Sequence, residues 1–175
     1  MRKKWFWVGL IFILSAPAVA AAETSKTYTN HYFLYSIDYP ETWRSKEISK
    51  VAVFTSPYDS VDDKFAENVS VVAEDLSQVP VEVSLIDYHR KAIGGASKML
   101  TDFNVLEEAQ TQLIGRDAII VLYTATLRGE KFKFKAYTVM VDKTAYVLTY
   151  TAREADFENF LPEAERLMRS IRVSP

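Results

Sequence analysis

Apolar and polar residues alternate through most of the second half of this chain. In four segments apolar and polar residues alternate with a period of two residues, which is typical of β-strands that bury one face. They are residues 105–113, 118–127, 131–141 and 145–152. The connections before the third and fourth segments are only three residues long, so these neighbours must pair as antiparallel hairpins. The pattern therefore predicts a four-stranded β-meander.

Shorter apolar runs in the first half of the chain predict three further strands, at residues 32–39, 51–55 and 69–73. Between and before them the sequence turns polar. Residues 24–30 predict a short mobile lead, and the acidic stretch at residues 58–68 predicts a loop.

A first helix is predicted from Ser84 to Leu100. Asp87 follows Ser84 by three residues, and this spacing lets each side chain bind a free backbone N–H of the first turn. Gly94 and Gly95 lie inside the helix, where each costs about 1 kcal/mol relative to alanine. We interpret the pair as a close contact with the sheet rather than as a loosened turn, because glycine allows close backbone approach.

A second helical stripe covers residues 157–171 and is apolar along one face. Pro162 lies within it, so the first turn can be separate and the main helix can begin near Pro162. The chain shows no internal repeat and no second linker. Residues 23–175 therefore predict a single α+β domain.

The first 22 residues have the layout of a secretory signal peptide. A basic start is followed by ten apolar or glycine residues, at positions 5–14, and then by a proline and small residues. Cleavage can follow Ala20 or Ala22. An uncleaved membrane anchor is the alternative, although the apolar run is only about half as long as a membrane-spanning helix. No cysteine follows this run, so the sequence excludes a lipid anchor of the bacterial lipoprotein type.

Composition removes several function classes. The chain has 21 Lys+Arg and 23 Asp+Glu, and loss of residues 1–22 takes away three cations, which leaves a formal charge of −5. An acidic exported domain is a poor candidate for binding nucleic acid. The absence of cysteine excludes thiolate nucleophiles and cysteine-ligated metals, and two histidines are too few for a multi-histidine site. We expect no required cofactor.

No nucleophile and base can be paired from the sequence, so we predict that the protein is not an enzyme. His89 is interpreted as a surface or half-buried helix residue. Asp59, Asp62 and Asp63 could offer oxygen ligands to calcium, but they lack the alternating spacing of an EF-hand loop. Solvated loop charge is the favoured interpretation of these three carboxylates.

Lys131, Lys133 and Lys135 alternate with apolar residues, so they should share one face of a strand. The simpler interpretation is the solvated face of a half-buried strand. The functional one is a basic stripe that docks an acidic protein partner, since this charge is local in an otherwise acidic chain.

Three parts of the chain together resemble the PsbP family, which is named for an extrinsic subunit of the photosystem II oxygen-evolving complex. They are residues 33–43, residues 67–72, and residues 150–173 with their helix. The resemblance implies an antiparallel sheet with helices packed on both faces, an α/β/α sandwich. It also implies a non-enzymatic role in binding or assembling a larger complex. Calcium is possible only through this resemblance, and no ligand residue of the family can be matched here.

The sequence therefore favours an exported binding or assembly module that acts on an envelope or membrane-associated partner. One alternative is an extrinsic subunit or assembly factor of photosystem II that helps to retain calcium. A second alternative is a carrier of a small ligand, which would need a large apolar pocket.

Overall fold

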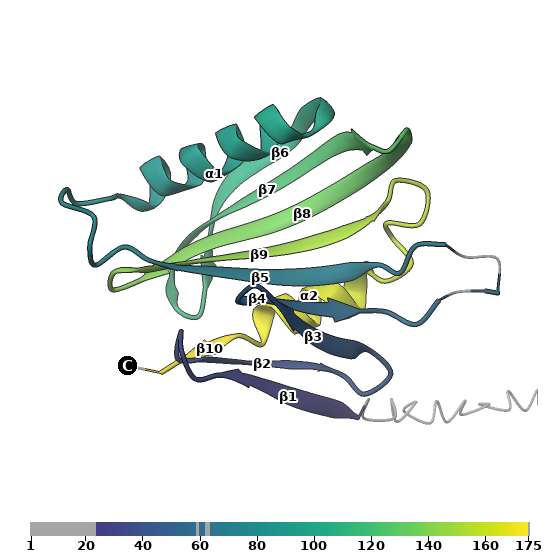
Figure 1. The fold of residues 1–175 in the computed structure, drawn as a ribbon, viewed down its shortest axis with the longest axis horizontal. Coiled ribbons are helices and arrows are strands. Elements are labelled where there is room, and N and C mark those ends of the chain that lie inside the picture. The colour runs from purple at the N-terminus through teal and green to yellow at the C-terminus, as the bar shows by residue number, and fades with distance from the viewer. Residues whose placement is uncertain (1–23, 59, 62–63, 175) are drawn as a thin grey trace, which may run out of the picture.

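The structure is a computed structural model that describes residues 24–58, 60–61 and 64–174 (Figure 1). The predicted signal peptide lies outside the described residues. The described part of the chain contains ten strands and two helices. In chain order they are β1 (Ser25–Asn30), β2 (Tyr35–Pro40), β3 (Arg44–Ile48), β4 (Val51–Thr55), β5 (Asn68–Asp75), α1 (Leu85–Met99), β6 (Thr101–Leu113), β7 (Arg116–Leu127), β8 (Glu130–Val141), β9 (Thr144–Arg153), α2 (Leu161–Arg169) and β10 (Arg172–Val173).

Seven strands form one antiparallel sheet in the order β3-β4-β5-β9-β8-β7-β6. Strands β6 to β9 follow one another as a meander, so this prediction is confirmed. The last strand of the meander, β9, pairs with the earlier strand β5, and β4 and β3 extend the sheet beyond β5. Helix α1 lies along the β6–β8 part of one face (Figure 1).

A second sheet of three strands, in the order β1-β2-β10, lies below the large sheet in Figure 1. Helix α2 packs against β2 of the small sheet and against β5 and β9 of the large one. It therefore lies between the two sheets. The main core of the protein is formed here, where apolar faces of both sheets meet the apolar stripe of α2.

The predicted α/β/α sandwich, one antiparallel sheet with helices on both faces, is wrong. Most of the described chain is strand, and the strands form two sheets rather than one. The reason lies in β1, which the sequence predicted as a mobile polar lead. It pairs with β2 along its whole length, from Ser25 opposite Pro40 to Asn30 opposite Tyr35. The hairpin separates β2 from the large sheet, and a second sheet covers the face that a helical layer was expected to cover.

Helix α1 begins after Ser84 as predicted, but only the Ser84 side chain of the predicted pair accepts from a backbone N–H. The Ser84 hydroxyl accepts a hydrogen bond from the Asp87 backbone N–H at 3.1 Å and donates one to the Asp87 carboxylate at 2.6 Å. The predicted close contact at Gly94 and Gly95 is wrong, because a Cβ added at either position would meet nothing within 4 Å. The helix passes over the sheet here without needing glycine to do so.

Helix α2 is shorter than its apolar stripe and begins at Leu161, with Pro162 in its first turn. Proline fits there because a first-turn N–H has no helical partner to lose. The alternative start near Pro162 is therefore confirmed. No helix in the described part of the chain is long and apolar enough to cross a membrane.

The two ends of the described chain meet in the small sheet. Strand β10 pairs with β2, and the Ser174 backbone N–H donates to the Leu34 carbonyl at 2.8 Å. Arg172 donates two hydrogen bonds to the Asp38 carboxylate, at 2.7 and 2.8 Å. These bonds lower the pKa of Asp38, because they stabilise its charged form. Ser170 also bonds the Asp38 backbone N–H and C=O through its hydroxyl.

Candidate functional site

The three lysines predicted as a docking stripe lie on one face of β8, as their spacing predicts. Phe132 and Phe134 lie on the opposite face, buried beneath α1. The lysines face the side of α2 and of the segment that precedes it. Lys131 is exposed and has no ion-pair partner in the described chain. The other two lysines lie further from solvent than a freely solvated strand face would place them.

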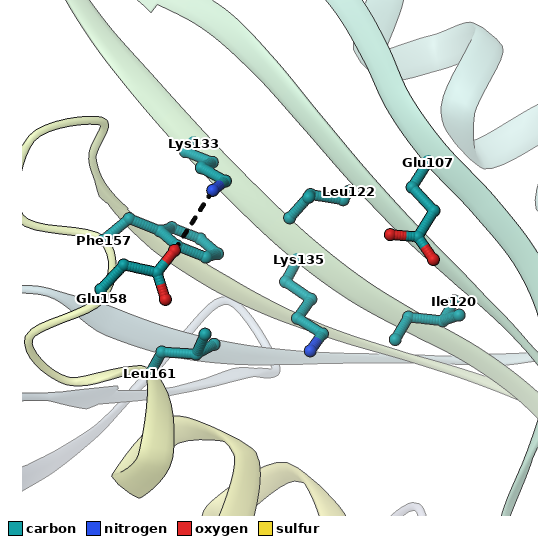
Figure 2. A pocket seen from close by; sticks show the side chains of 8 residues that line it. All are labelled: Glu107, Ile120, Leu122, Lys133, Lys135, Phe157, Glu158 and Leu161. Atoms are coloured by element: carbon teal, nitrogen blue, oxygen red, sulfur yellow. Dashed lines mark hydrogen bonds and ion pairs between the residues drawn. The ribbon is translucent and has the colours of Figure 1, made fainter.

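Lys133 is held from two directions. Its ammonium group lies 3.3 Å from a carboxylate oxygen of Glu158 and 4.4 Å from the centroid of the Phe157 ring (Figure 2). The Lys133 side chain is only 21% exposed, whereas that of Glu158 is 72% exposed. An ion pair with one solvated partner contributes little, typically below about 1 kcal/mol. Glu158 can therefore be displaced from Lys133 by a competing carboxylate at small cost.

Lys135 belongs to a tighter network. It pairs with Glu165 of α2, and Arg169 pairs with the same carboxylate at 3.1 Å. The Tyr137 hydroxyl donates to Glu165 at 3.0 Å and accepts from Arg169 at 2.7 Å. Burial raises the pKa of Tyr137 to about 12, so this hydroxyl stays protonated. Two cations share one carboxylate, which leaves the network with a net positive charge.

A small cavity of about 170 Å³ opens beside these lysines (Figure 2). Its apolar lining comes from Ile120, Leu122, Leu161 and the Phe157 ring, and its charged lining from Lys133, Lys135, Glu107 and Glu158. The volume is below the usual size of a small-molecule pocket, about 300–1,000 Å³. The cavity is suited to one side chain of a partner, with the two lysines in its lining.

A larger hollow of about 590 Å³ lies at the segment before α1, against Met140 of β8. Most of its lining is apolar, but two of its walls are open to solvent. Val79 is 38% exposed and Val81 is 68% exposed. A ligand here would stay in contact with water, so this hollow lacks the enclosure of a carrier site.

The prediction that His89 is a surface or half-buried residue is wrong. His89 is 1% exposed, and its Nδ1 lies 3.0 Å from the Thr138 hydroxyl, on the face of β8 that carries Phe132 and Phe134. Its Nε2 lies 3.3 Å from the Glu108 carboxylate of β6, without good hydrogen-bond geometry. Thr138 lies on the same face of β8 as the buried residues Phe132 and Phe134. A polar residue at such a position was the signal in the sequence that it has a buried partner.

Hydroxyl, imidazole and carboxylate stand here in the order of a nucleophile triad. Thr138 is also 1% exposed, however, so a substrate cannot reach its hydroxyl. The pair instead ties α1 to the sheet. Among the described residues no group of three or more His, Asp or Glu side chains is arranged to hold a metal ion. Asp59, Asp62 and Asp63, the weak calcium candidates, lie outside the described residues.

The sequence signature of the PsbP-like protein family matches residues 16–170, almost the whole chain. The chain belongs to the PsbP-like family. A comparison with curated proteins gives no significant match. Family membership therefore confirms the resemblance drawn from the sequence, and the match covers the segments that carried it except residues 171–173.

Solved structures show the same fold at low identity. Cyanobacterial PsbP (CyanoP) from Synechocystis is 15% identical, with a TM-score of 0.62, over 91% of this chain and 98% of that one. A protein of unknown function from Pseudomonas aeruginosa, described as a putative regulator, is 17% identical, with a TM-score of 0.62, over 86% and 98%. LpqN of Mycobacterium tuberculosis, described as involved in cell envelope biogenesis, is 12% identical, with a TM-score of 0.56, over 88% and 86%. These identities support a shared fold alone.

Proposed function

We propose that this chain is an exported, non-enzymatic PsbP-like module that docks an acidic segment of an envelope or membrane-associated protein. The observation that carries the proposal is the cavity beside Lys133 and Lys135, where an apolar floor adjoins ammonium groups that are only partly neutralised. A partner side chain would fill the cavity while a neighbouring carboxylate replaced Glu158 on Lys133. Lys131, without a partner of its own in the described chain, would add to the field that attracts that segment.

We take support for an exported location from the leader-like residues 1–22 and from the fold, which a protein described as involved in cell envelope biogenesis shares. A role as an extrinsic subunit of photosystem II rests on the likeness to cyanobacterial PsbP. A source organism without photosystem II would exclude it. The carrier alternative gains nothing from the open hollow at Val79 and Val81.

The test is capture of envelope proteins from the source organism by wild type and by the double variant Lys131→Gln, Lys133→Gln. Lys135 is left in place because its loss would also leave Glu165 without one of its two cations. The matched control is Lys91→Gln, Lys98→Gln, which removes the same charge from two exposed positions on α1, across the sheet.

We expect the β8 variant to lose most of the captured partner at low salt and the α1 variant to retain it. Capture by wild type should weaken as salt rises, since exposed charges are screened over about 8 Å at physiological ionic strength. Equal capture by all three proteins would show that the lysines are only a solvated strand face. Unchanged melting temperatures of both variants would confirm that folding is intact.

A further inference from the structure

Strand β6 forms one outer edge of the seven-stranded sheet, with β7 as its only strand neighbour in the described chain. It is 13 residues long and most of its residues are exposed. The opposite edge, β3, has five residues and carries Arg44, Lys46 and Glu47. Short, charged edges protect sheets against pairing with other chains, and β6 has this protection only in part.

The regular part of this edge can be located from the hairpin that follows it. Ile114 and Gly115 have φ values of 50° and 70°, so they form a two-residue turn closed by Leu113 and Arg116. The register shifts in β6 all lie before Glu107. From Glu107 to Leu113 the strand is therefore regular and about 23 Å long.

The closing pair of such a hairpin exchanges both of its backbone hydrogen bonds, and bonded pairs then alternate along the strand. Leu113 and every second residue before it bond to β7. The residues between them, Glu108, Gln110 and Gln112, turn their backbone N–H and C=O groups outward, away from the sheet. All three side chains are exposed, so these outward groups form an open row.

We propose that this row pairs with the same row of a second copy, antiparallel, about a two-fold axis through Gln110. Gln110 then lies opposite Gln110, and Glu108 lies opposite Gln112 on both sides of the axis. Each pair exchanges two backbone hydrogen bonds, and each carboxylate faces an amide that can donate to it. The register also brings Leu106, which is 50% exposed, toward Ile114 of the second copy.

This register alone pairs Glu108, Gln110 and Gln112 of one copy with the same three residues of the other. An axis through Glu108 would place two carboxylates opposite each other, which destabilises a strand pair. An axis through Gln112 would place the turn against Gln110 and leave few residues to pair. A second copy thus satisfies every outward group from Glu108 to Gln112 without opposing like charges. Such a strand-only interface is small, so the dimer should form reversibly as concentration rises.

The test is sedimentation equilibrium of the purified protein over a concentration series into the high micromolar range. Wild type should show a reversible monomer–dimer equilibrium. Gln110→Lys should abolish it, because the axis places two ammonium groups opposite each other. Gln110→Glu should abolish it for the same reason, and an equimolar mixture of the two variants should restore a dimer that contains one of each.

Two further variants separate side-chain from backbone effects. Gln110→Ala keeps the backbone N–H and should keep the dimer. Gln110→Pro removes an N–H that bonds nothing within the sheet, so it should fold with an unchanged circular dichroism spectrum and remain a monomer. A wild-type protein that is monomeric throughout would overturn the proposal. So would a dimer that survives Gln110→Lys, or a mixture of the charged variants that stays monomeric.

Discussion

At the scale of single residues, the buried pair of His89 and Thr138 has more influence than its size suggests. An imidazole in the interior costs free energy unless its ring nitrogens find partners. The Thr138 hydroxyl, 3.0 Å from Nδ1, is the hydrogen-bond partner that the described structure provides. The pair also joins the first half of α1 to the last third of β8, two elements far apart in sequence. It is therefore a link between layers that satisfies Nδ1 of the imidazole, whereas Nε2 has no hydrogen-bond partner among the described residues.

Thr138→Val should destabilise the protein by about 1–3 kcal/mol, because valine has a similar shape but leaves Nδ1 of His89 buried without a partner. Guanidinium denaturation at neutral pH measures this change. Combining it with His89→Leu should recover part of the loss, since two apolar residues replace both partners. A change in the free energy of unfolding below about 0.5 kcal/mol for Thr138→Val would be typical of a surface position and would contradict this role.

At the scale of the elements, α1 contains two glycines that its packing does not require. Gly94 and Gly95 lie in the interior of the helix, and the space where a Cβ would stand is open. Glycine loses more conformational freedom on folding than any other residue, and here no close contact offsets that loss. The second half of α1 is therefore less stable than the same helix with alanine.

Gly94→Ala and Gly95→Ala should each stabilise the protein by about 0.5–1 kcal/mol. The matched control is Gly115→Ala in the β6–β7 turn. The space around Gly115 is equally open, but its φ of 70° is unfavourable for alanine, so this variant should be less stable than wild type. Thermal unfolding of the three variants shows whether each is more or less stable than wild type. Destabilisation by either helix variant would indicate a contact at the helix that the structure lacks.

The elements differ in how well the sequence predicts them, for physical reasons. The meander was predicted correctly because β7, β8 and β9 bury alternate side chains. Strand β3 was missed because all five of its residues are exposed, so burial leaves no period in its sequence. Strand β1 was missed for the same reason, since only Asn30 at its end is buried. Edge strands whose residues are mostly exposed carry little hydrophobic signal.

For the candidate site, the spacing of the three lysines was enough to place them on one face, but not to reveal their partners. Glu158 and Glu165 come from a segment more than twenty residues further along the chain. Only the packing of α2 between the sheets brings these carboxylates to β8. A contact of this kind depends on the tertiary fold. The predicted α/β/α sandwich was wrong, so it could not place α2 beside β8.

At the scale of the whole molecule, two sheets and a helix enclose one core, and aromatic side chains fill much of it. Tyr35, Phe54, Tyr137, Tyr150 and Phe157 are among its largest fully buried side chains. Burial of such a core is the main driving force for folding, and the described residues hold no metal cluster that would add to it.

Removal of divalent metal should therefore leave the stability unchanged. We expect the same melting temperature in excess chelator and in excess calcium. A bound ion present at 100 times its dissociation constant would add about 2.7 kcal/mol, which such a comparison detects easily. A clear rise in calcium would indicate a metal site. Substitution of Asp59, Asp62 and Asp63 by Asn would then show whether that loop provides it.

The pairing of β2 with β10 also determines when this protein can fold during its synthesis. Arg172 is synthesised 134 residues after Asp38, and together with Val173 and Ser174 it completes a sheet whose other strands come from residues 25–40. Until they emerge, β2 lacks one neighbour and α2 lacks the anchor that Ser170 gives it on Asp38. The small sheet of a nascent chain must therefore remain incomplete until residues 172–174 have been added. A polypeptide that is to be threaded through a membrane pore before it folds would benefit from this delay.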